Sequence, residues 1–193
     1  MTFAIIAGIV ICCLSSSSVA VDQSRLEGMF NRDPALTTFK SADLSFDHPK
    51  SGWKLSAVPG SETVIVFLIK GNNEATVAVH KTRKEFPLEA SEMTDFFAET
   101  ERTVIEKQYP GATNIESVLA SHPQLGPILQ SDYVRPEGNL KYRVRELSVP
   151  RGSVLYKAVF SARLDKFKEM QPVFQRMIDS MQIVTPSQPK ASR

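Results

Sequence analysis

Residues 64–80 read VIVFLIKGNNEATVAVH, and this stretch decides the fold. The apolar run at 64–69 is short and rich in β-branched side chains, which predicts a strand buried on both faces of a sheet. Residues 75–80 alternate in side-chain facing, with Val77 and Val79 on one side, which predicts a second strand. The turn residues Gly71-Asn72-Asn73 between them predict an antiparallel hairpin.

Upstream of this hairpin, the chain favours two short extended pieces at residues 44–46 and 53–55, joined by a turn that contains Pro49 and Gly52. We expect Trp53 to close one end of the core. Residues 21–41 show no regular pattern, and we expect a linker or irregular segment there.

After Pro87 the apolar period changes from two to about 3.6 residues, which predicts an amphipathic helix. Acidic residues occupy its first turns, Lys107 lies near its last turn, and Pro110-Gly111 ends it. The predicted apolar stripe of this helix consists of Met93, Phe96, Phe97, Val104 and Ile105.

Four further strands are predicted downstream, separated by segments rich in proline and glycine. These strands are residues 113–119, 128–135, 140–149 and 154–163. Within 140–149 the apolar parity changes, because Tyr142 and Val144 are even-numbered whereas Leu147 and Val149 are odd-numbered. A β-bulge near residues 145 and 146 would restore one common face.

The last element is a helix that begins near Asp165, a suitable N-cap. Its apolar face consists of Phe167, Met170, Phe174, Met177, Ile178 and Met181. Pro172 either kinks this helix or lies early in it after a separate first turn. The order of elements contains no repeated βαβ unit, so we predict an α+β fold: a mainly antiparallel sheet of about six to eight strands packed by two principal helices.

This order, together with three motifs, resembles the PsbP-like superfamily, which is named for an extrinsic subunit of the oxygen-evolving complex. The motifs are FDHP with Gly52-Trp53 at residues 46–53, ATVAV at residues 75–79, and FQRMIDSM at residues 174–181. The likeness covers residues 43–184 and implies a PsbP-like α/β/α sandwich. The superfamily contains photosystem subunits, nuclear transport cofactors, effector chaperones and envelope lipoproteins, so the resemblance implies no single function, although most members bind rather than catalyse.

Residues 1–20 have the composition of a signal peptide. They carry no charged side chain, residues 3–14 are almost wholly apolar, and Ser18-Val19-Ala20 is a small-x-small cleavage pattern. We expect cleavage after Ala20, and a periplasmic or extracellular protein with no transmembrane span in the mature chain. Cys12 and Cys13 both lie in this segment, so the mature chain would have no thiol, and lipoprotein anchoring on one of them is the alternative. Residues 42–184 then form a single domain, and residues 185–193, with two prolines, are expected to be a disordered tail.

A formal net charge of only +2 argues against a nucleic-acid binder. The sequence contains no recognised nucleophile, phosphate-loop or zinc motif, so we nominate no catalytic residue, metal ligand or cofactor. His48, His80 and His122 have no ligand-like spacing.

Basic residues are the most suggestive surface feature. Lys141, Arg143 and Arg145 share one face of a predicted strand, with Arg135 and Lys157 on its neighbours. They are candidates for binding an anionic envelope component or an envelope protein. The other interpretation is a solvated face, or one that meets the acid-rich helix of the same molecule. We therefore expect an exported, non-enzymatic binding or accessory protein of the cell envelope or periplasm, with a carrier of a small apolar or lipid ligand, or a hydrolase, as alternatives.

Overall fold

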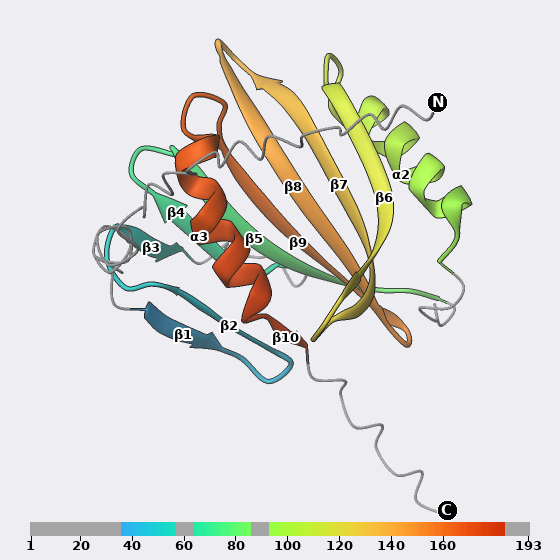
Figure 1. Ribbon diagram of the computed structural model, residues 1–193, viewed down its shortest axis with the longest axis horizontal. Coiled ribbons are helices and arrows are strands. Elements are labelled where there is room, and N and C mark those ends of the chain that lie inside the picture. The colour runs from blue at the N-terminus through green and yellow to red at the C-terminus, as the bar shows by residue number, and fades with distance from the viewer. Residues whose placement is uncertain (1–35, 57–63, 86–92, 184–193) are drawn as a thin grey trace, which may run out of the picture. The chain divides into compact units, whose positions relative to one another are not determined.

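The computed structural model describes residues 36–56, 64–85 and 93–183, and these form two antiparallel sheets and two helices (Figure 1). The larger sheet has seven strands in the order β3-β4-β5-β9-β8-β7-β6. Its strands are β3 (Trp53–Ser56), β4 (Val64–Lys70), β5 (Ala75–Arg83), β6 (Thr113–His122), β7 (Gly126–Glu137), β8 (Leu140–Arg151) and β9 (Val154–Arg163). The helices are α2 (Asp95–Gln108) and α3 (Phe167–Asp179). The predicted α+β class, with a seven-stranded antiparallel sheet and two helices, is confirmed.

The predicted hairpin is confirmed, because β4 and β5 pair antiparallel with Lys70 opposite Ala75. Gly71 opens the turn with φ +55°, in the left-handed region that glycine adopts without steric cost. Burial of β4 is less complete than predicted. Val66 and Leu68 are buried on one face, whereas Phe67 on the other face is only half-buried, because α2 packs over β6 and β7 at the far end of the sheet.

A second, three-stranded sheet has the order β1-β2-β10 and shows that one expectation was wrong. Its strands are β1 (Leu36–Lys40), β2 (Leu44–Pro49) and β10 (Gln182–Ile183). Strand β1 lies inside the segment that we expected to be irregular. The two predicted extended pieces are both strands, but they lie in different sheets: β2 pairs with β1 and β10, whereas β3 pairs with β4 of the large sheet.

Helix α3 covers one face of the large sheet, called here the α3 face, and its entire predicted apolar stripe is buried. Phe174 lies at the centre of this core, with ring contacts to Trp53, Phe160 and Phe167. The contact with Trp53 agrees with the expected role of this tryptophan at one end of the core.

The start of α3 differs from the prediction. Lys166, rather than Asp165, is the residue at the N-cap, and Asp165 instead accepts hydrogen bonds from Arg163. Pro172 lies within a single helix rather than after a separate first turn.

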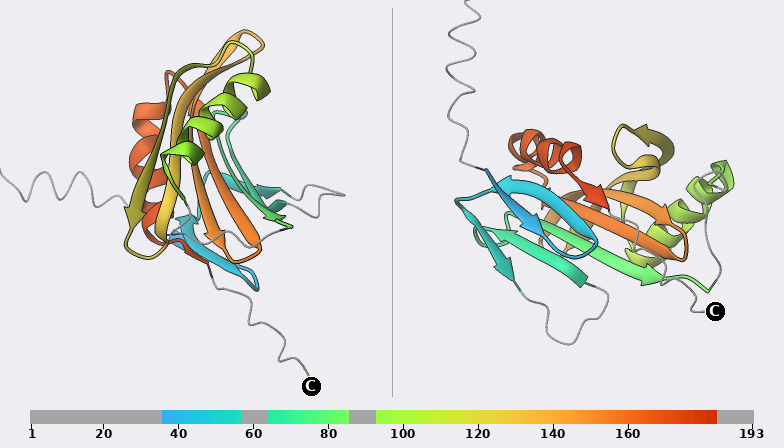
Figure 2. Two further views of the ribbon diagram at one scale, coloured as in Figure 1. Left: turned by 90° about the vertical axis from the view of Figure 1, so that its right-hand side faces the viewer. Right: turned by 90° about the horizontal axis from the view of Figure 1, so that it is seen from below.

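The predicted bulge in β8 is wrong. The pairing of β8 is continuous with both β7 and β9, so its odd and even residues keep opposite faces throughout. Leu147 and Val149 join the core beneath α3, whereas Tyr142 and Val144 pack with Ile105 of α2 on the opposite face, called here the α2 face. Figure 2 shows the two helices on opposite sides of the sheet. The apolar parity changes along β8 because a different helix covers each half of the strand.

The predicted apolar stripe of α2 is only partly correct. Met93 and Ile105 are buried and Phe97 is half-buried, but Phe96 is 75% exposed and Val104 is 42% exposed. Helix α2 lies against the outer strands β6 and β7, so only a narrow strip of its surface meets the sheet. The remaining part of its inner surface borders a cleft. The expected signal peptide (1–20), most of the expected linker (21–41) and the expected tail (185–193) lie outside the described residues.

Candidate binding cleft

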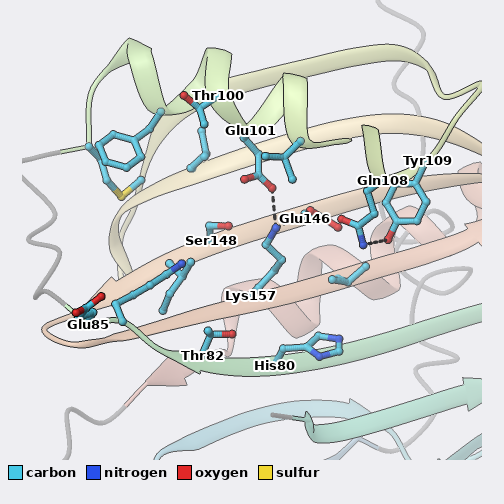
Figure 3. Close-up of a pocket in the computed structure, with 17 residues that line it drawn as sticks. His80, Thr82, Glu85, Thr100, Glu101, Gln108, Tyr109, Glu146, Ser148 and Lys157 are labelled. Atoms are coloured by element: carbon cyan, nitrogen blue, oxygen red, sulfur yellow. Dashed lines mark hydrogen bonds and ion pairs between the residues drawn. The ribbon is translucent and has the colours of Figure 1, made fainter. Parts of the chain in front are cut away.

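A cleft of about 930 Å³ lies between α2 and the α2 face of the large sheet (Figure 3). Strands β5, β8 and β9 form its floor, α2 forms one wall, and Leu129 of β7 also borders it. This space, called here the α2 cleft, exists because α2 packs closely on β6 and β7, and no other described element covers the α2 face of the neighbouring strands.

Most of the surface of the α2 cleft is apolar. Alternation along β9 directs Leu155 and Val159 to this face, and Phe97 and Val104 contribute from α2. Polar side chains also border the cleft, among them the hydroxyls of Thr82 and Ser148 on the floor. An apolar surface with a few convergent polar groups is the usual composition of a small-molecule site.

Three charged residues meet at the centre of the α2 cleft, and we call them the Glu–Lys–Glu bridge. Lys157 Nζ on β9 donates to Glu101 Oε1 on α2 at 2.6 Å and lies 3.4 Å from Glu146 Oε2 on β8. Figure 3 shows Glu101 pointing down from the helix toward Lys157. The bridge therefore ties α2 to the sheet across the cleft.

The sheet side of the bridge is buried. The side chain of Glu146 is only 7% exposed, and its Oε1 accepts a hydrogen bond from the Tyr133 hydroxyl at 2.9 Å. The ring of Tyr133 in turn stacks on Tyr109 at 5.6 Å between centroids, just after the end of α2. Both oxygens of Glu146 are thus engaged, which limits the cost of burying this carboxylate.

The electrostatics of the cleft follow from this arrangement. Burial by itself lowers the pKa of Lys157, but the negative charge of Glu146 and the hydrogen bond to Glu101 outweigh it, so the pKa lies above its ordinary value. Burial holds the pKa of His80 below 6.5, and the nearby positive charge of Lys157 acts in the same direction against the opposing charge of Glu146. Lys157 is therefore charged and His80 neutral at pH 7.

The five basic candidates from the sequence do not form one surface. Lys141, Arg143 and Arg145 share the α3 face of β8, as the alternation predicts. Arg135 and Lys157 lie on the opposite, α2 face, because they belong to the same face as Tyr142 and Ser148, their partners in register.

Most of these basic groups have partners within the molecule. Arg145 Nε donates to Asp132 Oδ1 at 3.0 Å, and Arg143 lies 5.2 Å from the ring centroid of Phe167. Arg135 pairs with Glu137 at 3.0 Å and also lies over the rings of Tyr109 and Tyr142. Lys157 contacts the acid-rich helix α2 of the same molecule, as in the interpretation that these basic residues have partners within the protein. Lys141 lies at an exposed position near the start of β8.

The three histidines lie apart. His48 Nδ1 is 3.0 Å from the carbonyl oxygen of Pro49, His80 borders the α2 cleft, and His122 Nδ1 accepts backbone N–H groups of Gln124 and Leu125. Within residues 36–56, 64–85 and 93–183, no group of three or more potential ligands could hold a metal ion.

Sequence reasoning did not single out Glu101, Glu146 and Tyr133 as a functional group, although the two glutamates each carry a local signal. Glu101 lies four residues after Phe97 and four before Ile105, so it interrupts the inner stripe of α2 with a charge. Glu146 is similarly placed on the same face of its strand as Tyr142 and Val144, because all three are even-numbered. A charge within an otherwise apolar face is the pattern that such residues leave in a sequence, but it does not say which charges meet.

Neither a known protein-family model nor a curated protein matches the chain. Solved structures with a similar fold are known. The solution structure of cyanobacterial PsbP (CyanoP) from Synechocystis sp. PCC 6803 superimposes with a TM-score of 0.56 at 15% identity, over 78% of this chain and 94% of that one. The crystal structure of LpqN, a protein involved in cell envelope biogenesis of Mycobacterium tuberculosis, gives 0.52 at 14% identity, over 82% and 96%.

The chain has a PsbP-like fold. The resemblance read from the sequence is thus confirmed for the architecture. At these identities the PsbP-like neighbours establish the fold alone, so the function rests on the chain's own residues. In the part of the chain that the structure describes, no helix is both long and apolar enough to cross a membrane.

Proposed function

We propose that this PsbP-like protein is an exported, non-enzymatic binding and accessory protein of the cell envelope or periplasm, and that the α2 cleft holds its ligand or partner. The proposal rests on the size and composition of this cleft. Its volume of about 930 Å³ is within the range of roughly 300–1,000 Å³ that is usual for ligand sites. Most of its lining residues belong to regular strands and one helix, so the site is largely formed before a ligand arrives, which lowers the entropic cost of binding.

The envelope location has two supports. Residues 1–20 have the pattern of a signal peptide. LpqN, which shares the fold, is described as involved in cell envelope biogenesis. The arrangement of the Glu–Lys–Glu bridge supports a binding role over a catalytic one, because Lys157 pairs with both carboxylates as in a structural ion-pair network.

A carrier of a small apolar or lipid ligand is the second candidate function. It is favoured by the apolar side chains that line the cleft on the floor and the helix wall, namely Met93, Phe97, Val104, Leu129, Leu155 and Val159. The two functions share the site and differ in the occupant: an accessory protein would hold part of an envelope component, whereas a carrier would enclose and release a free molecule.

The cleft is tested with N-phenyl-1-naphthylamine, a neutral apolar dye that fluoresces when it leaves water. We expect saturable binding by the purified protein, and loss of that binding in Thr82→Trp. Thr82 is exposed on the cleft floor, so an indole there fills the space without disturbing the core.

Arg83→Trp is the matched control, because Arg83 is the next residue of β5, is also exposed, and faces the other side of the sheet. It should bind the dye as the parent does. Equal binding by the parent, Thr82→Trp and Arg83→Trp would show that the dye binds elsewhere and would refute the α2 cleft as the site.

Export is tested separately, by fractionating cells that produce the protein and sequencing its N-terminus. We expect an envelope or periplasmic protein that begins at Val21. A cytoplasmic protein that retains residues 1–20 would contradict the proposed location and leave the cleft experiment unaffected.

A further inference from the structure

The charges around the α2 cleft do not balance. Its lining contains two lysines, Lys84 and Lys157, against three carboxylates, Glu85, Glu101 and Glu146. Lys84 and Glu85 are exposed just after the end of β5, where water screens them and their charges offset one another. The imbalance therefore lies in the Glu–Lys–Glu bridge, where two carboxylates share a single ammonium.

This excess negative charge is in a poorly solvated place. The side chains of Glu101 and Glu146 are 16% and 7% exposed. Among the described residues, Lys157 is the only cation whose nitrogen lies within 4.0 Å of either carboxylate. A buried charge that is only partly compensated is costly, so an added cation at this point would be bound favourably.

His80 does not supply the second positive charge. It borders the same cleft, but burial and Lys157 keep its pKa below 6.5 despite the opposing effect of Glu146, so its ring is neutral at pH 7. Tyr133 donates a neutral hydrogen bond to Glu146 and adds no charge. The deficit of one positive charge in the bridge is therefore left for a ligand.

Around the bridge the cleft is apolar, with Phe97, Leu129 and Val159 among its lining residues. We propose that the α2 cleft takes a small amphiphile with one cationic nitrogen and an apolar body, the nitrogen binding beside Glu101 and Glu146 and the body contacting the apolar walls. This inference rests on the proposed binding function of the cleft and adds the chemical class of its ligand. An anionic head group would instead face two carboxylates.

Three probes with alkyl chains of the same length and different head groups test the chemical class of the ligand. They are octylammonium, octan-1-ol and octanoate, each competing with N-phenyl-1-naphthylamine at pH 7. We expect octylammonium to bind at least about tenfold more tightly than octanoate, with octan-1-ol between them. The ammonium forms a partly buried ion pair with the carboxylates of the bridge, whereas the carboxylate of octanoate is repelled by them. Equal affinities for the three probes would refute the ligand class while leaving the cleft as a binding site. Failure of the dye and of all three probes to bind would refute both proposals.

One substitution and its matched control test the assignment to the bridge. Glu101→Gln removes one of the two carboxylates and should reduce the preference for octylammonium over octan-1-ol by about tenfold. Glu99→Gln is its control, because Glu99 is on the same helix, is 68% exposed and pairs with Arg102 on the surface. Equal losses in both variants would contradict the assignment to the bridge.

Lys157→Met leaves both carboxylates of the bridge without their ammonium, and we expect it to lower the melting temperature. Octylammonium should then raise the melting temperature of Lys157→Met by more than it raises that of the parent, because the ligand nitrogen replaces the missing ammonium. Octan-1-ol should show no such difference. A rescue no larger for octylammonium than for octan-1-ol would overturn the proposal.

Discussion

Two phenylalanine substitutions of the same kind should have very different effects on stability, because one ring is in the core beneath α3 and the other is on the surface of α2. Phe174 is 2% exposed, and its ring centroid lies 5.6 Å from Phe160, 6.0 Å from Phe167 and 6.4 Å from Trp53. It thereby joins α3 to β9 and β3. Phe96 is 75% exposed, with a ring contact to its neighbour Phe97.

The magnitudes follow from burial. Removing a buried phenylalanine ring costs the transfer free energy of the ring and the free energy of the cavity left behind, so Phe174→Ala should lower the free energy of unfolding by about 4 kcal/mol. For Phe96→Ala, the small loss of buried area is offset by the higher helix propensity of alanine, so the change should stay within about 0.5 kcal/mol.

Urea unfolding followed by far-ultraviolet circular dichroism measures both values, and similar slopes against urea would show that the same two states are being compared. A loss below about 2 kcal/mol for Phe174→Ala would mean that α3 does not pack as described. A loss for Phe96→Ala as large as that for Phe174→Ala would mean that the Phe96 ring is buried, and it would contradict the placement of α2.

Four further predictions concern pH and surface charge. Because the pKa of His80 is lowered in the folded protein, the unfolded chain binds the proton more readily, so this residue's contribution to stability should be lost as pH falls below 6.5. In His80→Gln, the urea midpoint should therefore depend less on pH in that range. Burial by itself raises the pKa of Asp43, but hydrogen bonds from Tyr156 and Lys81 lower it overall, so stability should fall as pH drops below 3.8 and Asp43→Asn should reduce this fall. Burial and Asp43 raise the pKa of Tyr156 to about 12, so the stability that this residue contributes should be lost as pH rises from 10 toward that value, and Tyr156→Phe should remove the loss. Lys141→Glu tests the basic strand as a contact for anionic envelope components: it should weaken sedimentation with phosphatidylglycerol vesicles more than Lys54→Glu does, with stability changed by less than about 0.5 kcal/mol, and equal weakening would exclude a specific role.

The prediction for Asp43 also bears on how the two sheets are held together. Asp43 precedes β2 of the small sheet and accepts hydrogen bonds from Tyr156 and Lys81, which belong to β9 and β5 of the large sheet. No local pattern in residues 36–49 predicts this link, because Asp43 is 38 positions from Lys81 and 113 positions from Tyr156 in the chain. The same holds for β10, whose two residues become a strand only by pairing with β2.

The candidate site was less predictable than the fold. The acid-rich helix and the lysine in β9 were both visible as sequence features, and their meeting within the molecule was one of two open interpretations. Their actual pairing, Glu101 with Lys157, depends on the angle and position of α2 over β6 and β7. The cleft itself is a volume left between elements that do not fully touch, and residue patterns describe which surfaces are apolar rather than how closely they approach.

The sequence by itself determined the elements whose periodicity is local: the β4–β5 hairpin, the four later strands, and the apolar stripe of α3 from Phe167 to Met181. Only the tertiary structure decided which face each strand buries, as in β8, where each half of the strand is covered by a different helix. Periodicity reports which residues avoid water, because burial of apolar area depends on residue type. The surface that covers those residues and excludes water is supplied by a distant part of the chain. For the α2 cleft, we propose that a bound ligand supplies it.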